Sequence, residues 1–315
     1  MTAPDNTPPR AMTVKRVAAG LARRARRVVG RMRAHLSVMR GRAAKRRAAA
    51  RTAAHVRAAL RSRQSPERLL GTPHPDSLAV VVCLWNRPHR IGAILTMLDR
   101  QHTNRRLRLI LWNNQPRDVE RYRDAVRRYR PSGALDSVEF TASPHNIGGI
   151  ARFVAMRHRV NDGYRGPFIM LDDDQDVSPS FITDLLAVAG ARTVAGLWAW
   201  RTGETYWERT RADGPGQPVD YVGTGGSVCD AELVAHDEFF TGIPPRFVFL
   251  EDMWMSWLAA ANGWRVVSAD TPVAFVEGDT DQYHALIAAK NEFYDWLREP
   301  GNLPQWGRAT GSSAD

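Results

Sequence analysis

The sequence has few cysteines and no long apolar run. Its 315 residues include two cysteines, Cys83 and Cys229, which excludes a disulfide framework and a cysteine-rich metal site. The longest apolar run, residues 78–85, is far shorter than the roughly 20 residues that span a bilayer. No apolar core of a secretory signal follows the basic N-terminus. We therefore expect a cytoplasmic protein with two buried thiols.

The first 65 residues almost lack acidic side chains and have no aromatic ones. They contain 18 Lys and Arg and a single acid, Asp5, which gives this segment a charge of +17. The other 26 basic and 32 acidic residues give −6, although the whole chain carries +11. The basic character therefore belongs to an N-terminal arm, and not to the rest of the chain.

The arm, residues 1–70, is rich in Ala and Arg and has no proline between Pro9 and Pro66, which favours a helix. Apolar residues recur at helical spacing, so residues 14–63 are predicted to lie on an anionic membrane surface. A solvated tail explains the same composition. Nucleic acid is a third partner class, but no aromatic side chain is present to stack on bases, and we expect no specific nucleic acid. Flotation with anionic liposomes, with and without residues 1–65, tests membrane binding.

Strands alternate with helices after the arm. A buried strand over residues 78–84 is predicted by its continuous apolar, β-branched run. Further expected strands cover residues 106–112, 137–141, 168–172, 193–200, 247–250, 264–268 and 273–276, and expected helices cover 91–98, 118–129, 150–160, 181–188, 253–261 and 285–296. The alternation predicts βαβ units and a mainly parallel sheet, with ligands at the carboxyl ends of the strands.

Residues 168–176, FIMLDDDQD, join four apolar residues to a cluster of carboxylates. Asp172, Asp173 and Asp174 are too close for all three to ionise without a counter-charge. Mn²⁺ or Mg²⁺ would supply one, since hard cations take oxygen ligands. An acidic turn that caps a helix beginning near Ser178 explains the same residues.

Period-two alternation along this strand predicts Asp172 and Asp174 on one side and Asp173 on the other. We expect Asp173 to face the nucleotide ribose or a basic neighbour, and Asp176 to cap the following helix.

A second acidic pair, Glu251 and Asp252, follows the apolar residues 247–250 and precedes a helix. A carboxylate here can act as a general base if it comes within hydrogen-bond reach of a substrate hydroxyl. Two acids at a helix N-terminus are also favoured by the helix dipole alone.

Several of these segments, in order, resemble the family 2 glycosyltransferases with the GT-A fold. They are VVVCLWNRPHRIGAIL, LILWNN, NIGGIARF, LDDDQDVSPSF and LEDMWMSWLAAANGWRV. The resemblance implies a GT-A type α/β domain over residues 76–300, with a mainly parallel central sheet flanked by helices. The basic helical arm would precede this domain, and a loose tail over residues 301–315 would follow it.

The resemblance also implies the functions of individual residues. Asp252 would be the catalytic base and Glu251 would orient or contact the acceptor, while Asp172 and Asp174 would hold the metal. His284 would be a further metal ligand, although a packing or surface histidine is an equal alternative. The nucleotide-sugar site would be formed by Asn86, Arg87, Asn114, Asn146, Gly148, Arg152, Asp172, Asp173, Gly225 and Gly226. Many relatives have an aspartate where this chain has Asn113–Asn114, so the base of the donor is not specified.

The implied function is inverting transfer of a sugar from a nucleotide diphosphate sugar to an acceptor hydroxyl, with Mn²⁺ or Mg²⁺ as cofactor. The acceptor would be a saccharide, a lipid-linked or another hydroxyl compound in polysaccharide or glycoconjugate synthesis, at the inner face of the membrane if the arm binds there. A nucleotidyltransferase would need a Gly- and Lys-rich phosphate loop after the first strand, and LWNRPHRI is not one. A membrane- or nucleic-acid-binding module with an inactive nucleotide-binding domain stays open.

Overall fold

The structure, a computed structural model, describes residues 37, 39–41, 43–62, 65–276 and 283–306. The chain divides into two units, residues 1–50 and 51–315. Residues 43–50 of the first unit are helical with mostly exposed side chains, and in the second unit residues 51–61 are helical as well. Among the described residues, no helix has the length and apolar character required to cross a bilayer. Residues 14–36 lie outside the described residues, so membrane association of the arm stays a prediction.

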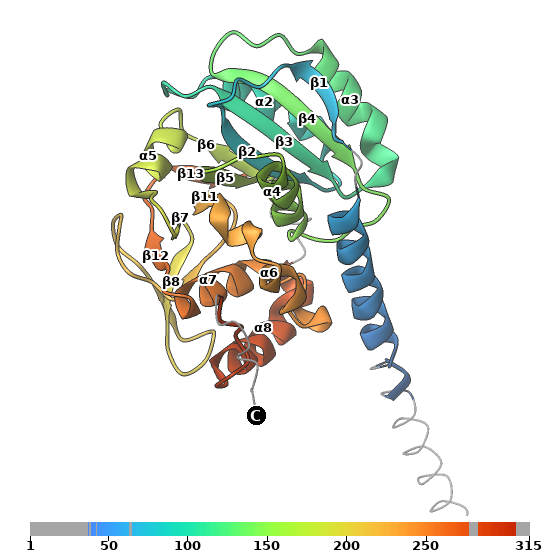
Figure 1. The fold of residues 1–315 in the computed structure, drawn as a ribbon, viewed down its shortest axis with the longest axis vertical. Helices are drawn as coiled ribbons and strands as arrows, with labels where there is room; N and C mark the ends of the chain where they lie inside the picture. Colours follow the sequence, from blue (N-terminus) through green and yellow to red (C-terminus); the bar gives the residue numbers. More distant parts are fainter. Residues whose placement is uncertain (1–36, 38, 42, 63–64, 277–282, 307–315) are drawn as a thin grey trace, which may run out of the picture. The chain divides into compact units, whose positions relative to one another are not determined.

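A large central sheet organises the second unit (Figure 1). Its strands, in spatial order, are β1 (Glu67–Gly71), β4 (Leu135–Ala142), β3 (Leu107–Asn113), β2 (Leu78–Leu84), β5 (Pro167–Asp172), β11 (Ser227–Asp230), β7 (Thr193–Gly196) and β12 (Arg265–Ser268). Only β1 and β11 run against the other strands of this sheet. The predicted mainly parallel sheet is therefore confirmed.

Helices cover both faces of this sheet, and two small sheets lie beside it. The helices are α2 (Ile91–Asp99), α3 (Val119–Arg128), α4 (Ala151–Asn161), α5 (Phe181–Val188), α6 (Glu238–Thr241), α7 (Glu251–Ala261) and α8 (Tyr283–Arg298). The small sheets are β10 (Tyr221–Val222) with β8 (Ala199–Thr202) and β9 (Arg209–Arg211), and β13 (Val273–Phe275) with β6 (Gln175–Val177). This α/β arrangement is the one that the GT-A resemblance implied.

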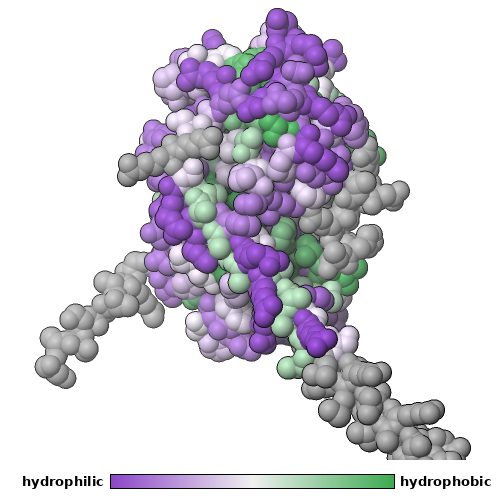
Figure 2. Space-filling model, turned by 90° about the vertical axis from the view of Figure 1, so that its right-hand side faces the viewer, coloured by the Kyte–Doolittle hydropathy of each residue, from purple (hydrophilic) through white to green (hydrophobic). Residues whose placement is uncertain are grey.

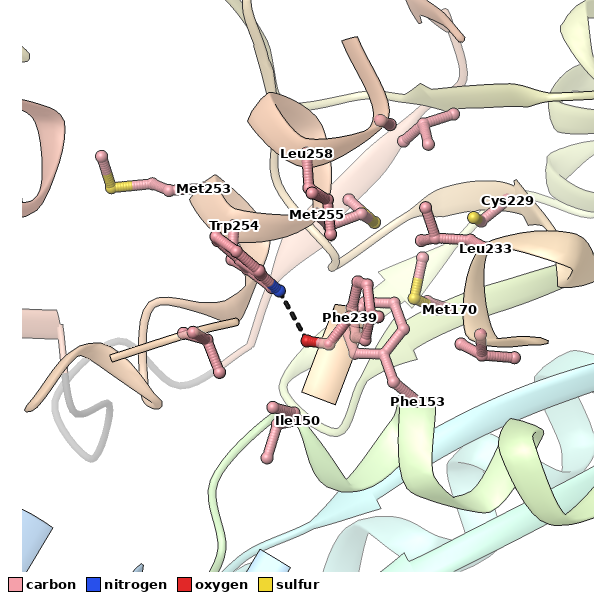
Figure 3. Packing of buried hydrophobic residues seen from close by; sticks show 14 of the residues in the cluster. Ile150, Phe153, Met170, Cys229, Leu233, Phe239, Met253, Trp254, Met255 and Leu258 are labelled. Atoms are coloured by element: carbon pink, nitrogen blue, oxygen red, sulfur yellow. Dashed lines mark hydrogen bonds between the residues drawn. The ribbon is translucent and has the colours of Figure 1, made fainter. Parts of the chain in front are cut away.

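Alternate residues of β2 enter two separate cores, as expected for a strand buried on both faces. Val80 and Val82 pack with α2, α3 and α5, whereas Ala79 and Val81 pack with α4, α7 and α8. Figure 3 shows part of the second core, where the indole N–H of Trp254 donates to the carbonyl oxygen of Phe239 at 2.7 Å. The hydrogen bond satisfies the only polar atom of a side chain that is fully buried.

The outer surface contrasts with these cores. Figure 2 shows the side of the molecule on which α3 lies, and hydrophilic side chains cover most of it, with small separate apolar areas. The two buried side chains of α3, Tyr122 and Val126, lie one helical turn apart, so its arginines remain on the outside.

Three expectations from the sequence are wrong in detail. The apolar run at 193–200 is not one strand. Its first half forms β7, which ends at Gly196, and its last two residues belong to β8, which lies in a different sheet. Residues 247–250 are not a strand, since Pro245–Phe247 form a 3₁₀ turn and α7 follows directly. Asp176 does not cap α5, because it lies in β6 and its carboxylate accepts a hydrogen bond from Arg90. β8 and β9 pair antiparallel and form a hairpin.

Candidate active site

One cavity of about 260 Å³ lies where the carboxyl ends of β2, β3 and β5 meet the start of α7. Parallel strands β3, β2 and β5 are neighbours in the sheet, so the polar residues that follow them come together at one edge. The cavity is lined by Cys83, Trp85, Arg87, Asn114, Asn146, Gly148, Gly149, Arg152, Asp172, Asp173, Asp174, Thr224, Phe249, Leu250, Glu251, Asp252, Leu286 and Lys290. Most of the predicted site residues therefore line one and the same cavity.

The acids after β5 are paired with arginine side chains. Arg87 contacts Asp173 at 2.7 Å and Asp174 at 3.3 Å, and all three side chains are largely buried. The backbone N–H of Trp85 also donates to Asp173. Burial raises the pKa of Asp173 to about 7, against the opposing effects of Trp85 and Arg87. Asp173 was expected to face either the nucleotide ribose or a basic residue, and in the structure it contacts the basic residue Arg87.

The predicted alternation of the acids does not hold beyond Asp172. β5 ends at this residue, and Asp173 and Asp174 form the turn that leads into β6. Both turn residues contact the same guanidinium, that of Arg87, because the period of two applies only while the chain is extended.

Arg152, on the first turn of α4, lies between two other acids of the cavity. Its Nη2 donates to Asp172 at 2.9 Å, and its Nε donates to the carbonyl oxygen of Gly149. Its Nη1 is buried and has no hydrogen-bond partner among the described residues. Burial, reinforced by the neighbouring Asp252 carboxylate, raises the pKa of Glu251 to about 7, although Arg152 opposes the shift. An unpaired guanidinium N–H of this kind is suited to bind an anion.

The candidate base, Asp252, is the second residue of α7 and is partly exposed. Its Oδ2 accepts a hydrogen bond from the hydroxyl of Tyr221, which comes from β10. Burial, together with the charge of Asp252, raises the pKa of Tyr221 well above its ordinary value, so this hydroxyl stays protonated and acts as a donor. Tyr221 therefore orients the Asp252 carboxylate.

Three predicted residues do not line the cavity. Asn86 has a left-handed backbone with φ of 60°, and its side-chain Oδ1 accepts hydrogen bonds from the side chains of Gln115 and Arg117. Gly225 and Gly226 are not among the lining residues. A Cβ on Gly225 would lie 2.4 Å from Asp172 Oδ2, so the glycine lets the backbone pass close to this carboxylate. The side chain of His284 lies outside the described residues, so its predicted metal ligation stays untested.

Sequence reasoning missed one residue that contacts the base, Tyr221, and one that lines the cavity, Lys290. Tyr221 carries no local motif, and only the fold brings it to Asp252. Lys290 lines the cavity from α8, is 5% exposed and lies 3.3 Å from the hydroxyl of Tyr206. It is the only lysine after Lys45, and a single lysine among the apolar residues of the helix predicted over 285–296 could have indicated a functional side chain.

The donor set fits a divalent cation that also binds a substrate. Among the described residues, no three His, Cys, Asp or Glu side chains form a complete metal cage. Asp172 and Asp174 both line the cavity, and Mg²⁺ in particular is commonly held by one or two carboxylates together with substrate phosphates.

A substitution at Gly149 tests how closely the cavity wall is packed. We expect Gly149→Ala to lower the free energy of unfolding by about 1–3 kcal/mol, since its Cβ would lie 1.7 Å from Glu251 Oε1. Displacing the buried Glu251 should also disturb Arg152 and weaken the binding of an anionic ligand in the cavity. Gly92→Ala is the matched control, because no atom lies within 4 Å of a Cβ there and α2 should be slightly stabilised. Urea unfolding and ligand titration of both variants check this, and equal behaviour would contradict the packing argument.

No protein-family model matches the sequence, and no curated protein matches it. Solved structures are similar in fold. The TarS fragment 1–349 of S. aureus is 15% identical over 61% of this chain and 57% of that one, with a TM-score of 0.41. The mannosyltransferase PcManGT from Pyrobaculum calidifontis, solved with GDP-Man and Mn²⁺, is 15% identical over 83% and 75%, with a TM-score of 0.45. GalNAc-T7, solved with UDP, GalNAc and Mn²⁺, is 12% identical over 64% and 44%, with a TM-score of 0.43. The match spans less than two-thirds of the TarS fragment and of GalNAc-T7, and these likenesses concern the fold alone.

Proposed function

We propose that this protein is a metal-dependent, inverting glycosyltransferase that moves a sugar from a nucleotide diphosphate sugar to an acceptor hydroxyl. One observation carries the proposal: a single cavity contains Asp172 and Asp174, the guanidinium of Arg152 and the carboxylate of Asp252. Departure of a diphosphate requires stabilisation of negative charge, and attack by a hydroxyl requires a base. Both kinds of group are present within reach of one bound substrate.

The donor would occupy the part of the cavity near the ends of β2, β3 and β5. Arg152, which lines the cavity, would stabilise the diphosphate by its positive charge, as charge-assisted interactions with phosphate are the strong ones. Asn114 holds the segment around Gly148 by two hydrogen bonds, one to Gly148 O at 3.1 Å and one from Ile147 N at 3.2 Å. Asn146 and Gly148 would thereby form a rigid wall against the nucleotide.

Asp172 and Asp174 would hold the divalent cation, Mn²⁺ or Mg²⁺. The bound cation supplies a Lewis acid that stabilises the negative charge of the departing nucleoside diphosphate. Asp173 would serve the site indirectly, because its hydrogen bonds with Arg87 and Trp85 join the acidic turn to the end of β2.

Asp252 would accept the proton of the acceptor hydroxyl as the oxygen attacks the anomeric carbon. A single displacement of this kind inverts the configuration at that carbon. The hydrogen bond from Tyr221 holds the carboxylate in one orientation. Glu251, buried against Gly149, would keep Arg152 in place, and the acceptor would be a saccharide, a lipid-linked or another hydroxyl compound.

Turnover of nucleotide sugars tests the proposal directly. We expect slow hydrolysis of at least one member of a panel of UDP-, GDP- and dTDP-sugars with Mn²⁺, and loss of that hydrolysis with a chelator. Isothermal titration should also show nucleotide binding that depends on Mn²⁺. A protein that neither turns over nor binds any of these donors in the presence of Mn²⁺ is not a glycosyltransferase of this type.

A further inference from the structure

A stacked pair of a half-buried and an exposed aromatic ring, Trp198 and Phe275, has no function in the proposed chemistry. The rings of Trp198 and Phe275 are stacked, with centroids 5.1 Å apart and planes 20° from parallel. Phe275 is 58% exposed and the next residue, Val276, is 41% exposed. Apolar side chains grouped on a surface in this way mark binding sites more often than isolated ones do.

The backbone on which each ring stands is hydrogen-bonded to a segment that contributes to the cavity. Phe275 pairs with Gln175 across β13 and β6, and the backbone N–H of Val276 donates to Asp174 O at 2.9 Å. The carbonyl oxygen of Trp198 accepts from Gly223 N–H at 2.8 Å, one residue before the cavity-lining Thr224. The stack therefore stands on segments that lead directly into two lining residues of the candidate active site, Asp174 and Thr224.

The indole ring is also held from the side of the small sheet. The guanidinium carbon of Arg211, on β9, lies 4.9 Å from the centroid of Trp198, which is cation–π distance. A ring with a fixed orientation loses little conformational freedom when a ligand binds, which favours affinity.

We propose that the Trp198–Phe275 stack binds a sugar ring of a saccharide acceptor. A pyranose ring has one face of C–H groups that matches an aromatic face in size and polarity, while its hydroxyls remain in water. The inference rests on the proposed glycosyl transfer, because it selects a saccharide among the acceptor classes that the chemistry permits.

The sheet separates this stack from the donor nucleotide. Trp198 follows β7, which lies two strands beyond β5, whereas Asn114 follows β3, two strands on the other side of β5. At about 4.8 Å between neighbouring strands, the two positions are roughly 20 Å apart along the sheet edge. The stack is therefore too far from Asn114 to bind the base of the same donor, and it lies on the side of β5 opposite to the proposed base site, where an acceptor can approach.

Substitution of Phe275 in the full chain tests the proposal. Binding is measured by saturation-transfer NMR and titration with a panel of oligosaccharides of hexoses and N-acetylhexosamines. We expect Phe275→Ala to weaken glycan binding about three- to tenfold, the range expected for loss of one aromatic contact. Phe275→Trp should retain binding, whereas Phe275→Leu, which keeps apolar bulk but lacks an aromatic face, should lose it. Since Phe275 is mostly exposed, thermal unfolding should show that all three variants fold.

Two results would overturn the inference: no oligosaccharide of the panel binds the wild-type chain, or Phe275→Ala binds as tightly as wild type. Mn²⁺-dependent titration of nucleotide sugars on the same samples separates the two proposals. Donor binding without glycan binding leaves glycosyl transfer standing and removes the stack as an acceptor site. Glycan binding that needs Phe275, without any donor binding, keeps the stack as a glycan-binding site but removes glycosyl transfer and, with it, the acceptor assignment.

Discussion

Replacing Asp252 with Asn should lower kcat for sugar transfer by about 10²- to 10⁴-fold, the usual contribution of a general base. The amide has the same shape but cannot accept the acceptor's proton, while Asp172, Asp174 and Arg152 remain to bind the donor. Donor affinity should therefore stay unchanged. Steady-state kinetics and calorimetric titration with the nucleotide sugar measure the two quantities.

Asp124→Asn is a matched control, because this aspartate is exposed on α3 and the substitution is chemically identical. It should have full activity. Tyr221→Phe should lower kcat less than Asp252→Asn, since it removes one hydrogen bond to the base and leaves the base itself. If Asp252→Asn abolishes donor binding as well as turnover, the assignment of Asp252 as the base is wrong.

The second large effect is expected at the acids after β5. Asp174→Asn and Asp172→Asn should each raise the Mn²⁺ concentration needed for half-maximal activity by at least about tenfold, as carboxylates are much better ligands for hard cations than amides. Mn²⁺ titrations of turnover and of nucleotide-sugar binding measure this shift. A variant that titrates like wild type would contradict the ligand assignment.

Asp176→Asn is the control within the same segment, because Asp176 lies in β6 and pairs with Arg90. Its Mn²⁺ dependence should be that of wild type. The metal should not be needed for folding, since Arg152 contacts Asp172 and Arg87 contacts Asp173 and Asp174 without it. A chelator is therefore expected to stop turnover and leave the thermal midpoint of the donor-free protein unchanged.

The strands at the centre of the sheet could be predicted because burial on both faces requires continuous apolar sequence. β2 and β5 met this condition, and their boundaries in the structure agree with the pattern. β11 has the sequence SVCD, which is too short and polar to indicate a central strand, although its first three residues are buried. Conversely, the apolar residues 247–250 follow Pro244 and Pro245, and they fold as a turn that packs into the core.

The charged residues of the candidate site could be predicted, whereas their partners could not. Acids after an apolar run indicate a strand end, and this places Asp172 without any tertiary information. The contact of Tyr221 with Asp252 joins β10 to α7 across 31 residues, and no local pattern reports such a distance. A basic neighbour of Asp173 was one of two predictions, but its identity as Arg87 and its second contact with Asp174 could not be predicted, because they depend on the turn geometry after β5.

The position of β11 in the sheet has a consequence for how the chain folds. Ser227 lies opposite Met170, so the edge of β5 that carries the acids is covered only by a strand that begins more than 50 residues later. Contacts between such distant residues form slowly. Before β11 pairs with β5, the edge of β5 has unpaired N–H and C=O groups. A nascent or truncated chain that stops before residue 227 should therefore aggregate or recruit a chaperone. The donor half of the site cannot be produced alone as an independent folding unit.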